Sequence, residues 1–95
     1  MGERQRLTAQ ITGRVQGVGF RWWIRSRAAE LNLTGWVMND ADERQVAVVA
    51  EGDTNDLDEL ERHLWRGPSG ARVEAVQVER GPASGEYQRF EIGRR

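Results

Sequence analysis

The feature that most restricts the fold is a change of hydrophobic spacing that recurs along the 95 residues. Leu7, Ala9 and Ile11 alternate with polar residues, which is the period-two pattern of a strand with one buried face. From about residue 21 to residue 33 the spacing becomes helical, and the apolar stripe consists of Phe20, Ile24, Ala28 and Leu31. A strand over residues 7–12 and a helix closed by Gly35 are therefore predicted, with a loop between them.

The rest of the chain repeats this change of spacing. Short apolar runs at residues 36–39 and 46–50 predict two strands, joined by a polar turn at residues 40–44. A second helix is predicted to begin at Asp53 or Thr54, to end at Gly67, and to bury three leucines, namely Leu57, Leu60 and Leu64. Two further strands are expected over residues 73–79 and 87–92.

This order of elements predicts an α+β fold. Two helices that cover one face of an antiparallel sheet, in the order βαββαβ plus a short final strand, form a ferredoxin-like sandwich. A chain of 95 residues has room for one core, so we expect a single domain over residues 1–95.

Composition narrows the function classes. The chain has no cysteine, which excludes disulfides, thiolate metal sites and thiol nucleophiles. Its 14 basic residues are all arginine and are balanced by 15 acidic residues, so no net field favours nucleic acid. No stretch has the length of a signal peptide core or a membrane span. We therefore expect a soluble cytoplasmic protein that binds neither membrane nor nucleic acid.

The stretch GRVQGVGFR, residues 13–21, carries the strongest functional signal. It joins a strand to the start of a helix, where backbone N–H groups converge and the helix dipole adds positive charge. Gly17 and Gly19 permit positive φ angles, and Arg14 and Arg21 flank the loop with guanidinium groups suited to phosphate oxygens. The pattern predicts a cradle for one phosphate.

Two nucleotide-binding motifs and a ligand-free turn are the alternatives for this loop. A nucleotide-binding P-loop needs a Gly-Lys pair, and this chain has no lysine. A dinucleotide fingerprint needs a third glycine at the position that Trp22 occupies. A tight turn with no ligand stays open on the loop alone, although an arginine at the helix start argues against it.

GRVQGVGFR followed by GWVMN at residues 35–39 resembles the acylphosphatase family. The resemblance runs from about residue 7 to residue 92 and includes VVAEG before the second helix, GP after it and FEI near the end. It implies hydrolysis of acyl phosphates to a carboxylate and inorganic phosphate, without metal or cofactor, by an enzyme expected to be a monomer.

The resemblance also implies roles for individual residues. Arg21 corresponds to the phosphate-binding arginine of the family, and Asn39 corresponds to the asparagine that orients the attacking water. Backbone N–H groups of the loop assist phosphate binding, and they belong to Val15, Gln16, Gly17, Val18, Gly19 and Phe20. Two departures are expected to weaken affinity, because Met38 replaces a frequent basic residue and the turn DADER at residues 40–44 is acidic and lacks glycine.

Two rival functions belong to other classes. RNA-recognition domains share this element order, but their stacking aromatics lie on the third strand, where QVAVVAE has none. A phosphate-binding or carbamoyl phosphate-binding accessory module would keep the pocket without the reaction, and turnover that depends on Asn39 would separate it from an enzyme.

The remaining aromatic residues are interpreted structurally. Trp23 and Trp65 are expected to pack in the core, and His63 is expected on the surface of the second helix. Trp22 should project away from the buried stripe, and we hypothesise that it contacts the organic group of the substrate or a partner.

Overall fold

The predicted order of elements is confirmed by the structure, a computed structural model that describes residues 3–93. Five strands and two helices follow one another along these residues: β1 (Arg4–Arg14), α1 (Phe20–Glu30), β2 (Thr34–Asn39), β3 (Gln45–Asp53), α2 (Thr54–Arg66), β4 (Arg72–Pro82) and β5 (Phe90–Ile92).

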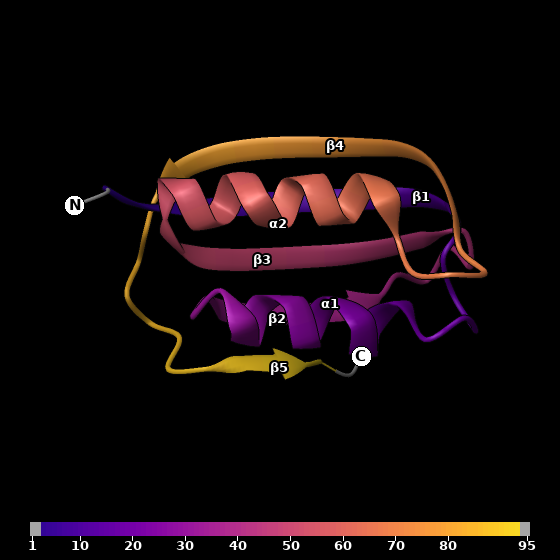
Figure 1. Ribbon diagram of the computed structural model, residues 1–95, viewed down its shortest axis with the longest axis horizontal. Helices are drawn as coiled ribbons and strands as arrows, with labels where there is room; N and C mark the ends of the chain where they lie inside the picture. Colours follow the sequence, from indigo (N-terminus) through magenta and orange to yellow (C-terminus); the bar gives the residue numbers. More distant parts are fainter. Residues whose placement is uncertain (1–2, 94–95) are drawn as a thin grey trace.

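The strands form one sheet in the order β4-β1-β3-β2-β5, as Figure 1 shows. β1 is antiparallel to both β3 and β4, and β2 is antiparallel to β3. The last strand departs from the predicted antiparallel sheet, because β5 runs parallel to β2. Its direction follows from the connection over residues 83–89, which carries the chain from the β4 edge to the opposite edge.

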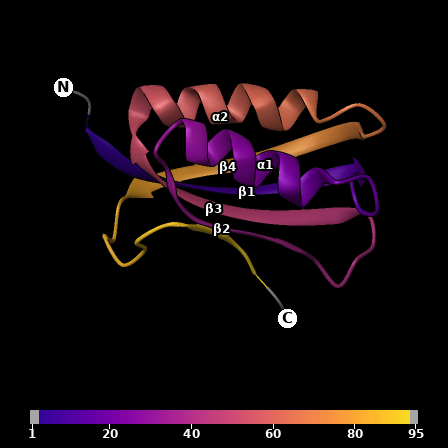
Figure 2. The same ribbon diagram turned by 60° about the horizontal axis from the view of Figure 1, so that its bottom comes forward.

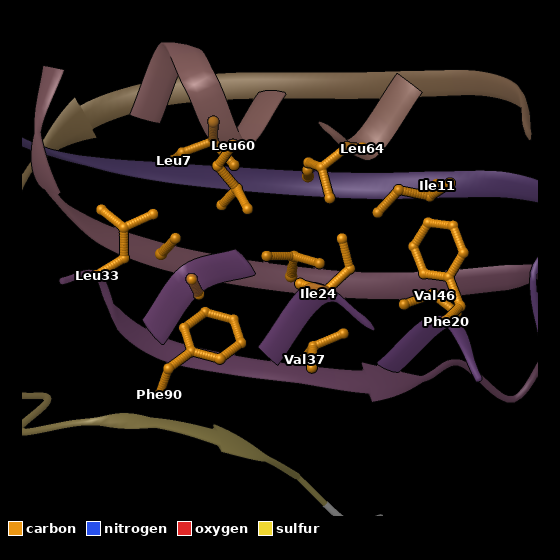
Figure 3. Packing of buried hydrophobic residues seen from close by; sticks show 14 of the residues in the cluster. Leu7, Ile11, Phe20, Ile24, Leu33, Val37, Val46, Leu60, Leu64 and Phe90 are labelled. Carbon is orange, nitrogen blue, oxygen red and sulfur yellow. The ribbon is translucent and has the colours of Figure 1, made fainter. Parts of the chain in front are cut away.

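Both helices cover the same face of the sheet, as predicted, and the second view shows them side by side above it (Figure 2). The core fills the space between helices and sheet. Alternate residues of β1, with Leu7 and Ile11 fully buried, meet leucines of α2 and the apolar stripe of α1 (Figure 3). The period-two and helical patterns in the sequence therefore point to the same core.

The first helix ends earlier than predicted. α1 stops at Glu30, and Asn32 adopts a positive φ of 57° where the chain reverses. Gly35, predicted to close the helix, lies instead within β2 with a φ of 138°. A Cβ at Gly35 would lie 1.9 Å from the carbonyl oxygen of Val49, so glycine is required by close strand packing.

The second helix agrees with its predicted limits. Asp53 is its N-cap residue, although the carboxylate makes no capping hydrogen bond, and Gly67 with a φ of 68° follows its last turn. The three predicted leucines are fully buried.

The prediction for Trp65 is wrong, and His63 is partly exposed rather than fully on the surface. Trp65 is 51% exposed, because it follows Leu64 and so points about 100° away from the leucine face. The His63 side chain is only 22% exposed, and its ring meets the edge of Trp23 at 5.6 Å between centroids. Trp23 packs against the core as predicted, and Trp22 is 62% exposed as predicted.

The side chain of Glu51, near the C-terminal end of β3, is completely buried. The Glu51 carboxylate accepts hydrogen bonds from Arg6 Nε at 2.8 Å, from the Ser84 N–H and hydroxyl at 2.9 Å each, and from the Gly85 N–H at 3.0 Å. Burial alone would raise the pKa of Glu51, but these hydrogen bonds outweigh it and lower the pKa to about 2. The carboxylate thus fixes the connection between β4 and β5 to the sheet.

Replacing Glu51 with glutamine should lower the free energy of unfolding at neutral pH by about 2–3 kcal/mol, because buried donors lose a charged acceptor. The native contribution is complete above the ordinary carboxyl pKa of 4.5 and is lost as pH falls towards 2. Urea unfolding from pH 7 to pH 2 should show the difference between the two proteins shrinking in that window. Glu86→Gln is the control, since that side chain is 58% exposed, and equal losses in both variants would contradict the assignment.

The helices of residues 3–93 are also too short and too polar to cross a membrane.

Candidate functional site

The candidate site lies at the end of the sheet where β1 leads into α1 and β2 leads into β3 (Figure 1). The pairing of β1 with β4 is irregular between Thr12 and Gly13, and the Gly13 N–H donates to the Arg44 carbonyl at 2.8 Å. Gly13 has a φ of 142°, and a Cβ there would lie 2.1 Å from the Arg72 carbonyl oxygen. Only glycine allows three chain segments to meet this closely before the loop begins.

Apolar side chains of the loop attach it to the hydrophobic core. Val15 and Phe20 are each 1% exposed, and Val18 packs against the core. Between them, Gly17 and Gly19 have φ angles of 75° and 76°, in the left-handed region. A Cβ at either glycine would meet nothing within 4 Å, so these positions need glycine for conformation and leave the backbone open.

The backbone N–H groups of the loop are unused by the protein. Among the described residues, none of the N–H groups of residues 15–22 donates to a protein acceptor. The first internal bond of α1 runs from the Trp23 N–H to the Gly19 carbonyl at 3.0 Å. The first turn of α1 carries no acidic residue, so its partial positive charge is not neutralised locally. Such a run of free amides is suited to an anion.

Arg21 adds a full positive charge to these amides. It lies in the first turn of α1, is partly buried, and has no hydrogen bond or ion pair with any residue that the structure describes. Other arginines on the same part of the chain do have partners: Arg27 pairs with Glu30 at 2.9 Å, and Arg44 pairs with Glu74. An unpaired, partly buried arginine that directly follows a run of free amides favours a phosphate or carboxylate ligand.

Asn39 is the last residue of β2 and follows the fully buried Val37 on the same face. Its Oδ1 atom is covered from solvent and accepts no hydrogen bond within the described part of the chain. A covered amide oxygen of this kind is costly unless it meets a donor, so the geometry suits a bound donor such as water.

The side chain of Gln16 joins the loop to the turn that follows Asn39. Its Nε2 lies 3.2 Å from the Asp40 carbonyl oxygen, 3.1 Å from that of Asp42 and 2.9 Å from that of Gln45. Only the backbone N–H of Gln16 was predicted to take part in the site, and this side-chain contact was not predicted. The one available signal was a long amide side chain inside a glycine-rich loop.

The acidic turn at residues 40–44 uses its carboxylates for its own structure. Asp40 Oδ1 accepts from the Asp42 N–H at 3.3 Å, and Asp42 Oδ1 accepts from the Arg44 N–H at 2.9 Å. These Asx-type bonds form the turn without the glycine that the resemblance led us to expect.

Comparison with known protein families places the chain in one of them. The acylphosphatase family profile matches residues 7–92. The chain belongs to the acylphosphatase family. It is therefore a hydrolase of the acylphosphatase type. An acylphosphatase from Salinibacter ruber is 45% identical over 93 residues, which cover 98% of this chain and 97% of that protein.

Solved structures extend the comparison to the fold. The crystal structure of acylphosphatase from Bacillus subtilis has a TM-score of 0.90 and 31% identity, and the match covers 95% of this chain and 99% of that one. Full-length HypF in a phosphate- and nucleotide-bound form matches with a TM-score of 0.87 and 30% identity. That match covers 98% of this chain but only 12% of HypF.

His, Asp and Glu side chains do not gather in groups of three or more that could hold a metal ion anywhere in residues 3–93. Independence from metal stays a prediction.

Gly19→Ala should lower the free energy of unfolding by about 1–2 kcal/mol, because a left-handed φ is strained for any residue with a Cβ. Gly81→Ala is the matched control, since Gly81 is also free of neighbours within 4 Å but lacks a positive φ. Its stability should be unchanged or slightly higher. Urea unfolding measures the free energy of unfolding of both variants. Equal changes would show that the left-handed backbone conformation of Gly19 does not cause the loss of stability.

Proposed function

We propose that this chain hydrolyses the carboxyl–phosphate bond of acyl phosphates to a carboxylate and inorganic phosphate, without metal or cofactor. Family membership supports the reaction class. The observation that supports the mechanism is that Arg21, which is unpaired within the described residues, directly follows a run of free backbone amides. Together they offer a site for a dianionic phosphate that needs no cation.

In this mechanism the phosphate sits in the loop. Its oxygens accept hydrogen bonds from the Arg21 guanidinium and from backbone N–H groups of the predicted residues, namely Val15, Gln16, Gly17, Val18, Gly19, Phe20 and Arg21. The amides are fixed before substrate arrives, since Val15, Val18 and Phe20 hold the loop to the core. Preorganised donors stabilise charge in the transition state without reorganisation.

Asn39 orients the attacking water. Its covered Oδ1 accepts a hydrogen from the water and so directs an oxygen lone pair towards phosphorus. A neutral amide suits this position, because a carboxylate would repel the phosphate. The proton of the water passes to a phosphate oxygen of the substrate as the P–O bond to the acyl group breaks.

The chemistry of the leaving group explains why Arg21, the loop amides and Asn39 are sufficient for this reaction. A carboxylate is a weak base and departs without protonation, so no general acid is needed. Phosphoryl transfer passes through a loose transition state in most analyses, and its rate depends mainly on positioning and charge stabilisation.

Benzoyl phosphate hydrolysis in the presence of a chelator tests the proposal. Arg21→Ala and Asn39→Ala should each lower kcat/KM by roughly 10²–10³, the usual cost of removing one group that stabilises or positions a transition state. Arg66→Ala and Asn55→Ala, two substitutions on α2, should leave the rate unchanged. A native protein that loses activity with chelator, or variants that match the controls, would contradict the assigned roles.

A second function is favoured by one comparison. HypF is a much longer protein, and this chain is similar to a part of it. A phosphate-binding or carbamoyl phosphate-binding module would bind inorganic phosphate through Arg21 without turnover. In that case Asn39→Ala would leave phosphate binding intact, and native protein would show no hydrolysis.

Trp22 provides a test of acyl-group recognition. Its ring is 62% exposed in the first turn of α1, and the Arg25 guanidinium lies over it at 5.6 Å. If Trp22 contacts the organic group, Trp22→Ala should raise KM for benzoyl phosphate about threefold to tenfold and leave KM for acetyl phosphate unchanged. Equal effects on both substrates would end this hypothesis.

The domain limits 1–95, the monomeric state, the cytoplasmic location and the lack of a nucleic-acid partner stay predictions.

A further inference from the structure

We propose that the side-chain amide of Gln16 is a positioning residue that sets the place of Asn39 relative to the phosphate-binding loop. This proposal rests on the function proposed above and adds a role that the loop sequence did not indicate. It concerns the carboxamide of Gln16 rather than its backbone N–H.

The Gln16 side chain contacts the turn through a single atom. One nitrogen, Gln16 Nε2, faces three backbone carbonyl oxygens between 2.9 Å and 3.2 Å away. An amide nitrogen has two hydrogens, so three acceptors must share them. Two of the contacts, those to Asp40 and Gln45, are partly buried. Partial burial strengthens a hydrogen bond relative to one in open water.

The acceptors belong to both sides of the turn between β2 and β3. Asp40 directly follows Asn39, and Gln45 is the first residue of β3. The Asp40 N–H also donates to the Gln45 carbonyl at 3.0 Å, so Gln16 binds the two residues whose backbones join β2 to β3 at the turn. A shift of Gln16 would therefore move the end of β2 that carries Asn39.

The Gln16 side chain connects residues 15–19 directly with the turn that follows Asn39. Val15 and Val18 direct their side chains to the core, and the bond from the Gly13 N–H to Arg44 lies before the loop. The Gln16 amide and the packing of α1 over β2 thus both hold the loop in position relative to Asn39.

The turn does not need Gln16 to fold. It has its own bonds, from the Gln45 N–H to the Asp42 carbonyl at 3.0 Å and from the Arg44 N–H to the Asp42 carboxylate at 2.9 Å. Loss of the Gln16 amide should therefore leave the loop amides, Arg21 and the internal bonds of the turn intact, while the turn and Asn39 shift relative to the loop. What changes is the alignment of water with phosphorus, and a misplacement of about 1 Å can cost about 10²-fold in rate.

Gln16→Ala is predicted to lower kcat for benzoyl phosphate at least about tenfold while the inhibition constant of inorganic phosphate changes by less than about threefold. Gln10→Ala is the matched control. Gln10 Nε2 donates to the Gln45 side chain at 2.7 Å, so this variant removes a similar bond to the same residue from the open face of the sheet. It should retain the native kcat. Thermal unfolding of both variants identifies any general loss of structure.

The double variant Gln16→Ala/Asn39→Ala separates positioning from a structural effect. If Gln16 acts through Asn39, its loss should cause little further decrease in kcat once Asn39 is absent. Equal fold-decreases in the native and Asn39→Ala backgrounds would overturn the proposal. A Gln16→Ala kcat within about twofold of native, or a parallel rise in the phosphate inhibition constant, would overturn it as well.

A measurement without turnover distinguishes failure of this proposal from failure of the proposed function. In ¹⁵N–¹H NMR spectra, the side-chain amide signals of Asn39 should shift in Gln16→Ala and stay unchanged in Gln10→Ala. Unchanged Asn39 signals in Gln16→Ala would overturn the positioning role whatever the activity. An inactive native protein with shifted Asn39 signals would overturn the proposed function and retain the positioning role.

Discussion

The pairing of β1 with strands on both of its sides determines where a site can form. β1 lies between β4 and β3, and all three backbones meet at Gly13, where a side chain would collide with the Arg72 carbonyl. The register of β1 and β4 shifts there, and the ladder ends one residue later at Arg14, where the loop begins. Because the Gly13 N–H also binds the Arg44 carbonyl, this crowded backbone junction holds the start of the loop close to the turn that follows Asn39.

Buried apolar side chains and backbone N–H groups without acceptors in the described residues lie next to each other at this end of the sheet. Burial of Val15, Val18 and Phe20 stabilises the loop, and the N–H groups of this segment have no acceptor within residues 3–93. At the opposite end, Glu51 shows the reverse arrangement, since every donor around it is matched to a carboxylate. The buried charge of Glu51 is thus satisfied within the protein, whereas we propose that the loop N–H groups at the other end bind an anion.

Periodicity was sufficient for the element order, the core leucines of α2 and the exposure of Trp22, because these follow from local spacing. It failed where tertiary contacts decide. Gly35 looked like a helix end but is required by the approach of Val49, and the direction of β5 depends on how the chain crosses the sheet. In the site, glycines and Arg21 were visible from motif and charge. The reach of the Gln16 amide to three carbonyls was not, because it depends on the shape of a turn 24 to 29 residues away.

The position of β1 between two strands that come later in the chain also bears on how fast the protein folds. Thr8, for example, lies opposite Val49 on one side and Glu79 on the other, so neither ladder can form by local zippering. Each pairing requires closure of a long loop before any contact compensates for the lost entropy. We therefore expect folding to be slower than that of helical bundles of the same length, with the sheet in place only after both ladders have closed.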